Sequence, residues 1–237
     1  PAISIGNVPQ LCCDLVISTL RLERVGFLND PNVTPFVGPK AYDHARSNLS
    51  TALEVFQCST GKFTVIQQRA PILRKQQRAF VENLAQFITD GSFTRVMLLS
   101  TIDATLRDDR QLTEGSSRKP PSPETTPGSS NLAQDYSQLS LHDQAKPTHR
   151  MWTPHIPGGG IAHQLHQVCE RLQLPLVVLL EFVAEGDNIP ESILMANGLH
   201  SLLGLLSPTG ELGSQEWVPP GSWHSFYSTR VPQMLYY

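Results

Sequence analysis

The sequence predicts an α/β fold in which a largely buried sheet is sandwiched between helices. Two observations predict it. Short β-like runs alternate with stretches of helical periodicity in both halves of the chain, and the run 176–182 is continuously apolar, as in strands buried on both faces. Apolar residues make up 40% of the 237 residues, enough for a packed core. A polar stretch, 111–150, is expected to be a flexible, disordered insertion within a single domain, 1–237.

The first half opens with a β-like run at 2–8. Pro9 suits the first turn of a helix, and the run 11–20 is apolar on nearly all sides, which predicts a buried helix. Three short strands are expected next, at 24–28, 53–57 and 63–68. A helix is then expected where apolar residues recur at helical spacing, at Phe80, Leu84, Phe87 and Ile88. A strand with a buried centre is expected at 95–100.

The second half repeats the alternation of helix and strand. A helix is expected at 161–172, followed by the apolar strand 176–182. A second, long helix should begin after Asp187 or Asn188, either of which can cap it, with Pro190 in its first turn. Pro208 and Gly210 are expected to end it. Its expected apolar stripe consists of Ile193, Leu199, Leu202, Leu203 and Leu206.

Composition argues against several classes of protein. The formal net charge is −3 and the 18 basic residues are spread along the chain, so a strongly basic nucleic-acid binder is not expected. The longest apolar stretch, 174–180, is far short of the roughly 20 residues that a membrane helix needs. No leader is recognised, and Cys12 and Cys13 are expected to be buried free thiols. A reducing, intracellular compartment fits these features.

Three glycines, 158–160, precede a predicted helix, where backbone N–H groups can hold a phosphate. The dinucleotide-binding and P-loop fingerprints are both incomplete, so a tight turn with close backbone packing is favoured. His163 and His166 lie three residues apart on that helix, with His155 nearby. Because no Cys or carboxylate motif completes a metal site, solvent-facing histidines are favoured. We therefore expect no cofactor and no metal.

Carboxylates raise two further possibilities. Glu181, Glu185 and Asp187 follow the apolar strand, where acid–base catalysts often lie. Helix capping by Asp187 and a favourable position for Glu185 near the helix N-terminus are the preferred explanations. Asp14 lies inside an apolar helix and needs a partner. An arginine, a turn amide and a subunit interface all remain open for it.

The C-terminal tail, 224–237, ends in Leu235, Tyr236 and Tyr237. This is a hydrophobic–tyrosine–any-residue (HbYX) ending with a terminal carboxylate. An aliphatic side chain, a phenol and a carboxylate can each find a distinct complement in a protein pocket, and capture of a C-terminal carboxylate is a recurring recognition mode. The alternative is a frayed tail without a role.

Several segments, in their order and spacing, together resemble the proteasome assembly chaperone 2 family. The resemblance covers about 1–110 and 151–237 and leaves only the polar insertion unmatched. Each segment alone is a weak signal, whereas the ordered set is specific. The matching segments are 3–8, 10–11, 14–20, 25–27, 36–38, Ile-Pro-Gly-Gly-Gly-Ile at 156–161, 182–190, and Pro-Pro-Gly-Ser-Trp at 219–223.

The resemblance implies a protein that is not an enzyme. Family members pair with a related chain, proteasome assembly chaperone 1, and the heterodimer binds the proteasome α-ring and assists its assembly. Some members dock an HbYX tail in pockets between α-subunits, and Leu235, Tyr236 and Tyr237 match that motif here. The implied fold is a three-layer mixed sheet flanked by helices, related to a nucleoside phosphorylase-like architecture. The implied compartments are the cytoplasm and also the nucleus.

A second hypothesis comes from a different class. The chain would be a phosphorylase- or hydrolase-like enzyme that uses the glycine turn 158–160 and the carboxylates near 185–187. Likeness of fold alone would support it, and fold does not determine function. Saturable, phosphate-dependent cleavage of a nucleoside would favour this hypothesis, and inertness toward a nucleoside panel would count against it.

Overall fold

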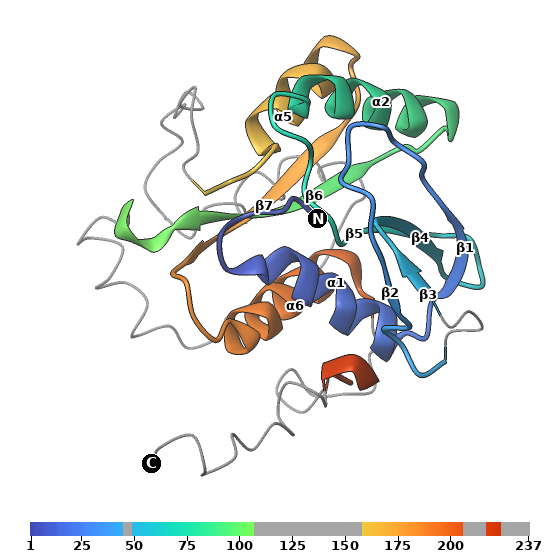
Figure 1. Ribbon diagram of the computed structural model, residues 1–237, viewed down its shortest axis with the longest axis vertical. Coiled ribbons are helices and arrows are strands. Elements are labelled where there is room, and N and C mark those ends of the chain that lie inside the picture. Colours follow the sequence, from blue (N-terminus) through green and yellow to red (C-terminus); the bar gives the residue numbers. More distant parts are fainter. Residues whose placement is uncertain (45–48, 107–157, 206–216, 224–237) are drawn as a thin grey trace, which may run out of the picture.

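The computed structural model describes residues 1–44, 49–106, 158–205 and 217–223 (Figure 1). The predicted insertion, 111–150, and the predicted tail, 224–237, lie outside these residues. Two parallel strands, β6 (Val96–Asp103) and β7 (Leu176–Val183), run through the middle of the molecule. Their register pairs Val96 with Leu176 and Asp103 with Val183.

Helices cover both sides of this central pair of strands. In Figure 1, α2 (Gln77–Asp90) and α5 (Ala162–Arg171) lie above β6 and β7, and α1 (Val8–Thr19) and α6 (Ile189–Leu203) lie below them. The expected α/β fold, with helices flanking the sheets, is confirmed. Among the described helices, none combines the length and the apolar character needed to cross a membrane.

The remaining strands form two antiparallel sheets beside the central pair. One has the order β1-β4-β5, from β1 (Glu23–Phe27), β4 (Leu53–Gln57) and β5 (Thr64–Gln68). The other is a hairpin of β2 (Val37–Pro39) and β3 (Leu49–Thr51), which the sequence did not predict. The strands expected at 24–28, 53–57, 63–68, 95–100 and 176–182 are confirmed, with bounds that differ by up to three residues at their ends. The single sheet expected from the alternation is divided into three within the described part of the chain.

The core has two parts, one on each side of β6. Leu99 joins the part built around α1 and α6, and Leu98, the next residue, joins the part built around α2 and α5. This follows from the alternation of side chains along a strand. Helix α1 buries eight of its 12 residues, as its apolar run predicts. Cys12 and Cys13 are buried free thiols, as expected, and burial raises the pKa of both.

The β-like run expected at 2–8 is not a strand. A short 3₁₀ turn, η1 (Ile5–Asn7), occupies its second part, and α1 begins directly after it. Gly6 and Asn7 have φ values of 72° and 54°, which end an extended conformation. The run still lies alongside β6: the Ala2 N–H donates a 2.8 Å hydrogen bond to the Leu99 carbonyl, and the Thr101 hydroxyl donates a 2.9 Å hydrogen bond to the Ile5 carbonyl.

The expected end and apolar stripe of α6 are also wrong. The helix ends at Leu203, where Gly204 adopts a left-handed conformation (φ 59°) and its N–H bonds to the His200 carbonyl. Leu206, Pro208 and Gly210 lie outside the described residues. Among the stripe residues that the structure describes, only Leu199 is buried, and the buried face of the helix is Ser192, Met195, Ala196 and Leu199.

The apolar strand β7 is less buried than its composition predicts. Only Val178 and Val183 are fully buried, and the other residues of the strand are half-buried. Within the described residues β7 pairs with β6 alone, so it is an edge strand of this small sheet. An edge strand keeps part of its surface accessible, which explains the difference.

Candidate functional site

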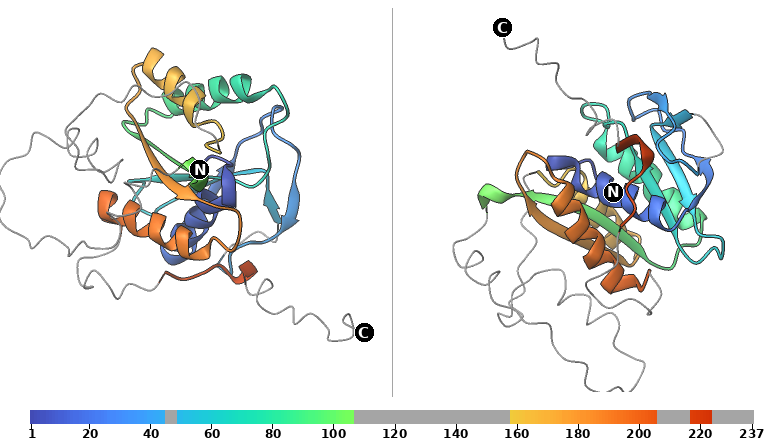
Figure 2. Two further views of the ribbon diagram at one scale, coloured as in Figure 1. Left: turned by 90° about the vertical axis from the view of Figure 1, so that its left-hand side faces the viewer. Right: turned by 90° about the horizontal axis from the view of Figure 1, so that it is seen from below.

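The residues predicted to form the functional site, Leu235, Tyr236 and Tyr237, lie outside the described part of the chain. What the structure does show is where the tail leaves the domain. The segment 217–223, here called the tail root, runs across α1 and α6 and ends in the short turn η4 (Gly221–Trp223) (Figure 2). Its position decides which face of the domain the C-terminal residues can serve.

Two tryptophans fix the tail root to the core. The side chains of Trp217 and Trp223 are only 6% and 4% exposed and belong to the core around α1 and α6. The Trp217 indole Nε1–H donates a 2.8 Å hydrogen bond to Asn197 Oδ1 on α6. The Val218 N–H donates to Thr19 Oγ1 at the end of α1. Both helices therefore hold the same segment.

The tail root also contacts the segment 40–44. The Ser222 N–H donates a 3.3 Å hydrogen bond to the Ala41 carbonyl. Gly221 lies so close to Asp43 that a Cβ atom at this glycine would collide with the carboxylate. The Pro-Pro-Gly-Ser-Trp segment thus has a glycine where the backbone must approach a neighbouring side chain closely.

A cluster of buried polar side chains lies behind this contact. Asp14 Oδ1 accepts hydrogen bonds from the Tyr42 hydroxyl (2.6 Å), Gln67 Nε2 (2.7 Å) and Arg69 Nη2 (2.9 Å). Arg69 Nε also pairs with Glu54 Oε2 at 3.3 Å. Of the partners left open for Asp14, the arginine is present, and a tyrosine and a glutamine side chain join it. We call Asp14, Tyr42, Gln67 and Arg69 the Asp14 cluster.

Burial and neighbouring charges shift the pKa values of Tyr42 and Arg69. Burial, and then the neighbouring Asp14 carboxylate, raise the pKa of Tyr42 well above its ordinary value. Burial alone would lower the pKa of Arg69, but the combined effects of Asp14, Tyr42 and Glu54 outweigh it, raise the pKa and keep the guanidinium charged. The cluster is therefore a charged, hydrogen-bonded unit in the interior. Because Tyr42 lies next to Ala41, the unit also fixes the carbonyl that receives the tail root.

The glycine turn 158–160 has a packing role. Gly158 and Gly160 have φ values of 81° and 59°, and a Cβ at Gly160 would collide with the Ile3 carbonyl. The Ile5 N–H donates to the Gly158 carbonyl at 3.0 Å, and the Ser100 hydroxyl donates to the Gly159 carbonyl at 2.8 Å. The preferred interpretation, a tight turn with close backbone packing, is confirmed.

The carboxylates in and after β7, Glu181, Glu185 and Asp187, differ in burial and in their contacts. Asp187 Oδ1 accepts the Ile189 N–H at 3.3 Å directly before α6, and Glu185 is exposed. The N-cap residue of α6 is Asn188, whose side chain makes no capping hydrogen bond, so Asp187 does not cap the helix as preferred. Glu181 is half-buried, and burial, followed by the nearby Glu191 carboxylate, raises its pKa to about 7. The sequence did not predict this effect of Glu191, because Glu191 lies on α6 and Glu181 lies on β7.

The predicted histidine set does not gather into a described site. His163 Nε2 lies 3.0 Å from Gln167 Nε2 on α5, and His155 lies outside the described residues. His163 and His166 are both half-buried, so the favoured interpretation of solvent-facing histidines is wrong for these two. In the described part of the chain, no group of three His, Cys, Asp or Glu side chains is placed to hold a metal ion.

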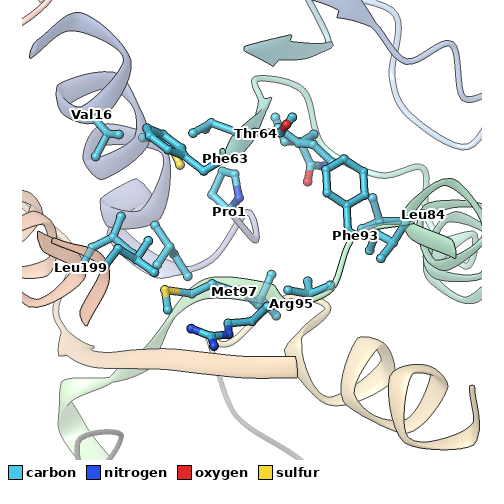
Figure 3. Close-up of a pocket in the computed structure, with 18 of the residues that line it drawn as sticks. Pro1, Val16, Phe63, Thr64, Leu84, Phe93, Arg95, Met97 and Leu199 are labelled. Atoms are coloured by element: carbon cyan, nitrogen blue, oxygen red, sulfur yellow. The ribbon is translucent and has the colours of Figure 1, made fainter. Parts of the chain in front are cut away.

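An apolar cavity of about 510 Å³ lies between β5 and β6 (Figure 3). Pro1 lies in the middle of this close-up, and Arg95, directly before β6, and Met97 of β6 face it from below. The volume is typical of small-molecule sites, but most of the lining is aliphatic or aromatic. Its labelled apolar residues are Val16, Phe63, Leu84, Phe93, Met97 and Leu199. Sequence periodicity gives no signal for such a gap between two sheets.

Four apolar side chains on the outer strands are exposed. Val25 and Phe27 on β1 are 58% and 67% exposed, and Val37 and Leu49 on β2 and β3 are 69% and 55% exposed. Arg24 Nη1 donates a 2.9 Å hydrogen bond to the Leu49 carbonyl and so links β1 to β3. Exposed apolar residues grouped on neighbouring elements are typical of surfaces that other proteins cover.

The fold and the ordered segments define a class of protein. The model of the PAC2 family matches residues 1–215, and the chain belongs to this family. A solved structure of similar fold is that of Pyrococcus furiosus PbaA, described as an archaeal homolog of proteasome-assembly chaperone. It has a TM-score of 0.59 at 9% identity and covers 88% of this chain and 76% of that one.

Curated relatives with similar sequences all have the same name. The chain is 33% identical to proteasome assembly chaperone 2 of Danio rerio over 248 residues, which is 100% of this chain and 93% of the relative. It is 36% identical over 207 residues to the protein of the same name from Nematostella vectensis, covering 81% of this chain and 83% of the relative. The human protein of that name is 28% identical over 245 residues, again with 100% and 93% covered.

Proposed function

We propose that this chain is a proteasome assembly chaperone. In this proposal it pairs with proteasome assembly chaperone 1, and the heterodimer binds the proteasome α-ring and promotes correct assembly of the core particle. The observation that carries the proposal is similarity along the whole chain to proteins named proteasome assembly chaperone 2. The exposed apolar side chains of β1, β2 and β3 support a role in binding other proteins.

The C-terminal residues are the proposed anchor on the ring. The Tyr237 carboxylate would meet a basic group in a pocket between α-subunits, the Tyr236 hydroxyl would bond near its rim, and Leu235 would fill an apolar hollow. The firmly held tail root supports this assignment, because an anchoring segment is useful only if its starting point is fixed. Residues 224–237 can span about 45 Å when extended.

A three-residue anchor binds weakly by itself. It contributes only a few kcal/mol after the loss of translational freedom and side-chain ordering. Useful affinity therefore comes from combining the tail with contacts of the domain and of the partner chain, which raise the effective concentration of the tail at its pocket. Weak, multiple contacts also allow release once the ring has matured.

We infer that the role is not catalytic. The glycine turn, on which the enzyme hypothesis depended, is occupied by backbone packing against Ile3 and Ile5. No observation favours the enzyme hypothesis over the chaperone hypothesis. The proposed location is the cytoplasm, with the nucleus as a second compartment, where proteasome subunits are assembled.

The proposal is tested by a quantitative pull-down from native cytosol. The full-length chain is compared with a chain that ends at Met234. We expect full-length protein to recover a related chain together with α-subunits, and the shortened chain to recover the related chain but few α-subunits. If neither protein recovers proteasome subunits, the proposed function is wrong.

A further inference from the structure

The apolar cavity of about 510 Å³ separates the edges of two strands, β5 and β6 (Figure 3). Residues 62–66 and 68, in and directly before β5, line one side, and residues 95–99, in and directly before β6, line the other. The two strands belong to different sheets, which have the orders β1-β4-β5 and β6-β7 in the described part of the chain. Each sheet therefore presents a strand edge to the same cavity.

The edge of β5 that faces away from β4 consists of Thr64, Ile66 and Gln68. The Arg69 N–H bonds to the Ala52 carbonyl, which marks one hydrogen-bonded pair of the β4–β5 ladder. Hydrogen-bonded pairs alternate with non-hydrogen-bonded pairs along an antiparallel ladder. The backbone N–H and C=O groups of the three edge residues are therefore directed away from β4, and all three residues line the cavity.

The edge of β6 that faces away from β7 has the same character. The Val96 N–H donates to the Pro175 carbonyl, so Val96 and every second residue after it bond to β7. The backbone groups of Met97 and Leu99 point the other way, where the Leu99 carbonyl accepts the Ala2 N–H. Within the described residues, no backbone hydrogen bond crosses the cavity from the Met97 amide or from the β5 edge.

The backbone around Pro1 already runs beside β6 and leads into the cavity. Ala2 bonds to Leu99 and Ile5 bonds to Thr101, so residue numbers rise in the same direction on both segments, as in a parallel pair. Followed backward from Ala2, this course passes Pro1, which lies in the middle of the cavity (Figure 3). A residue joined to the nitrogen of a proline favours the extended conformation, which suits a strand.

Apolar side chains from both parts of the core surround the cavity. Val16 and Leu199 belong to the part around α1 and α6, and Leu53 and Phe80 belong to the part around α2 and α5. A strand in the cavity meets apolar surface on both faces, as continuously apolar strands do in buried sheets. A small apolar molecule would fill the volume but leave the backbone groups of the two strand edges without partners, whereas a strand satisfies both.

We propose that this cavity is the seat of one further β-strand, an apolar extended segment joined directly to Pro1. The strand runs parallel to β6, bonds to the free edges of β5 and β6, and unites the two sheets into one. Because β5 has five residues, a strand of about five residues, about 17 Å long, covers its edge. The seat is present whether or not the protein binds a ring, so it is independent of the proposed function.

Amide hydrogen exchange, resolved by residue with NMR, tests the seat in the full chain. One protein carries the apolar extension Val-Ile-Val-Leu-Val before Pro1, and a matched protein carries Gly-Ser-Gly-Ser-Gly in its place. With the apolar extension, we expect the amides of Thr64, Ile66 and Met97 to exchange about tenfold more slowly than in the unextended chain, because they gain hydrogen bonds to the added strand. With the Gly-Ser extension, their exchange should be unchanged.

Two comparisons make this test specific. The amides of Val65 and Leu98 already bond within a sheet, so their exchange should change less. The separate peptide Val-Ile-Val-Leu-Val at equal concentration should give no protection, because it lacks the high effective concentration of a joined segment. Equal exchange in the two extended proteins would overturn the proposal. Equal protection by the separate peptide would also overturn it, by assigning the cavity to another chain. No proteasome subunit takes part, so failure here is distinguishable from failure of the pull-down.

Discussion

The Tyr42 hydroxyl donates a 2.6 Å hydrogen bond to Asp14 Oδ1, and this contact connects helix α1 to the segment that holds the tail root. Tyr42 is only 2% exposed, and Arg69 Nη2 donates to both the Tyr42 oxygen and Asp14 at 2.9 Å. The next residue toward the N-terminus, Ala41, accepts the Ser222 N–H. A buried polar cluster thus helps to set the point from which the C-terminal tail departs.

Removing the carboxylate of this cluster should destabilise the protein strongly. Asp14→Ala leaves the Arg69 guanidinium buried without its main partner and should lower the free energy of unfolding by about 3–5 kcal/mol. Tyr42→Phe removes only a hydroxyl and should cost about 1–2 kcal/mol. Urea denaturation measures both. Asp90→Asn, at the exposed end of α2, is the control, and a cost for Asp14→Ala no larger than the control's would refute the role given to the cluster.

Two glycines with the same backbone conformation test the packing role of the turn at 158–160. Gly160 and Gly204 both have φ 59°, but a Cβ at Gly160 meets the Ile3 carbonyl, whereas Gly204 has open space around it. Gly204→Ala should cost about 1–2 kcal/mol from the left-handed conformation alone. Gly160→Ala should cost more, by about 1–3 kcal/mol, because the backbone must also move. Similar unfolding midpoints for the two variants would show that the close approach is not important.

The contact between Gly221 and Asp43 offers a test of the tail root. Gly221→Ala places a methyl group against the carboxylate and should loosen the segment 217–223, which amide hydrogen exchange would detect as faster exchange. Gly26→Ala is the matched control, since a Cβ there meets no atom within 4 Å. Adding Asp43→Ala removes the colliding group and should restore slow exchange. Failure of this second change to restore it would contradict the proposed contact.

Glu181 should make stability depend on pH. Burial, and then the Glu191 carboxylate, raise its pKa from 4.5 to about 7, so the folded state holds this proton more tightly than the unfolded state does. Its contribution is fully present below about pH 4.5 and is lost as the pH rises toward 7. At pH 8, Glu181→Gln should be more stable than the unmodified protein by about 1–2 kcal/mol, after allowance for solvent screening.

The comparison with Glu185→Gln keeps this test specific. Glu185 is exposed, so its substitution should leave the pH dependence of urea denaturation unchanged. If the stability difference between Glu181→Gln and the unmodified protein is the same at pH 5 and pH 8, the carboxyl of Glu181 does not titrate in this range.

Local patterns predicted the elements well where one signal dominated. The strand β4 was predicted with its observed bounds, Leu53–Gln57, and α1 was recognised from its apolar run. The prediction of an extended run at 2–8 was wrong, because the positive φ values of Gly6 and Asn7 outweigh the β propensity of the neighbouring residues. The hairpin strands β2 and β3 are three residues each, too short to show a period.

Contacts between distant residues were harder to predict. The sequence showed that Asp14 needs a partner, but Arg69 lies 55 positions away and Tyr42 lies 28 positions away. Only the fold brings them together. Part of the tail root was recognised as a family segment from the sequence. Its hydrogen bonds to Thr19, Ala41 and Asn197, however, depend on the packing of α1 and α6. The glycine turn was predicted correctly, because steric needs of glycine are local.

The affinity of the purified heterodimer for isolated α-rings tests the central claim most directly. The related chain is paired with the full-length protein and, in parallel, with a protein that ends at Met234. The tail anchor predicts that truncation weakens ring binding by about tenfold or more, a loss of at least about 1.4 kcal/mol, and leaves heterodimer formation unchanged. Equal affinities of the two heterodimers for the ring would contradict the proposed role of Leu235, Tyr236 and Tyr237.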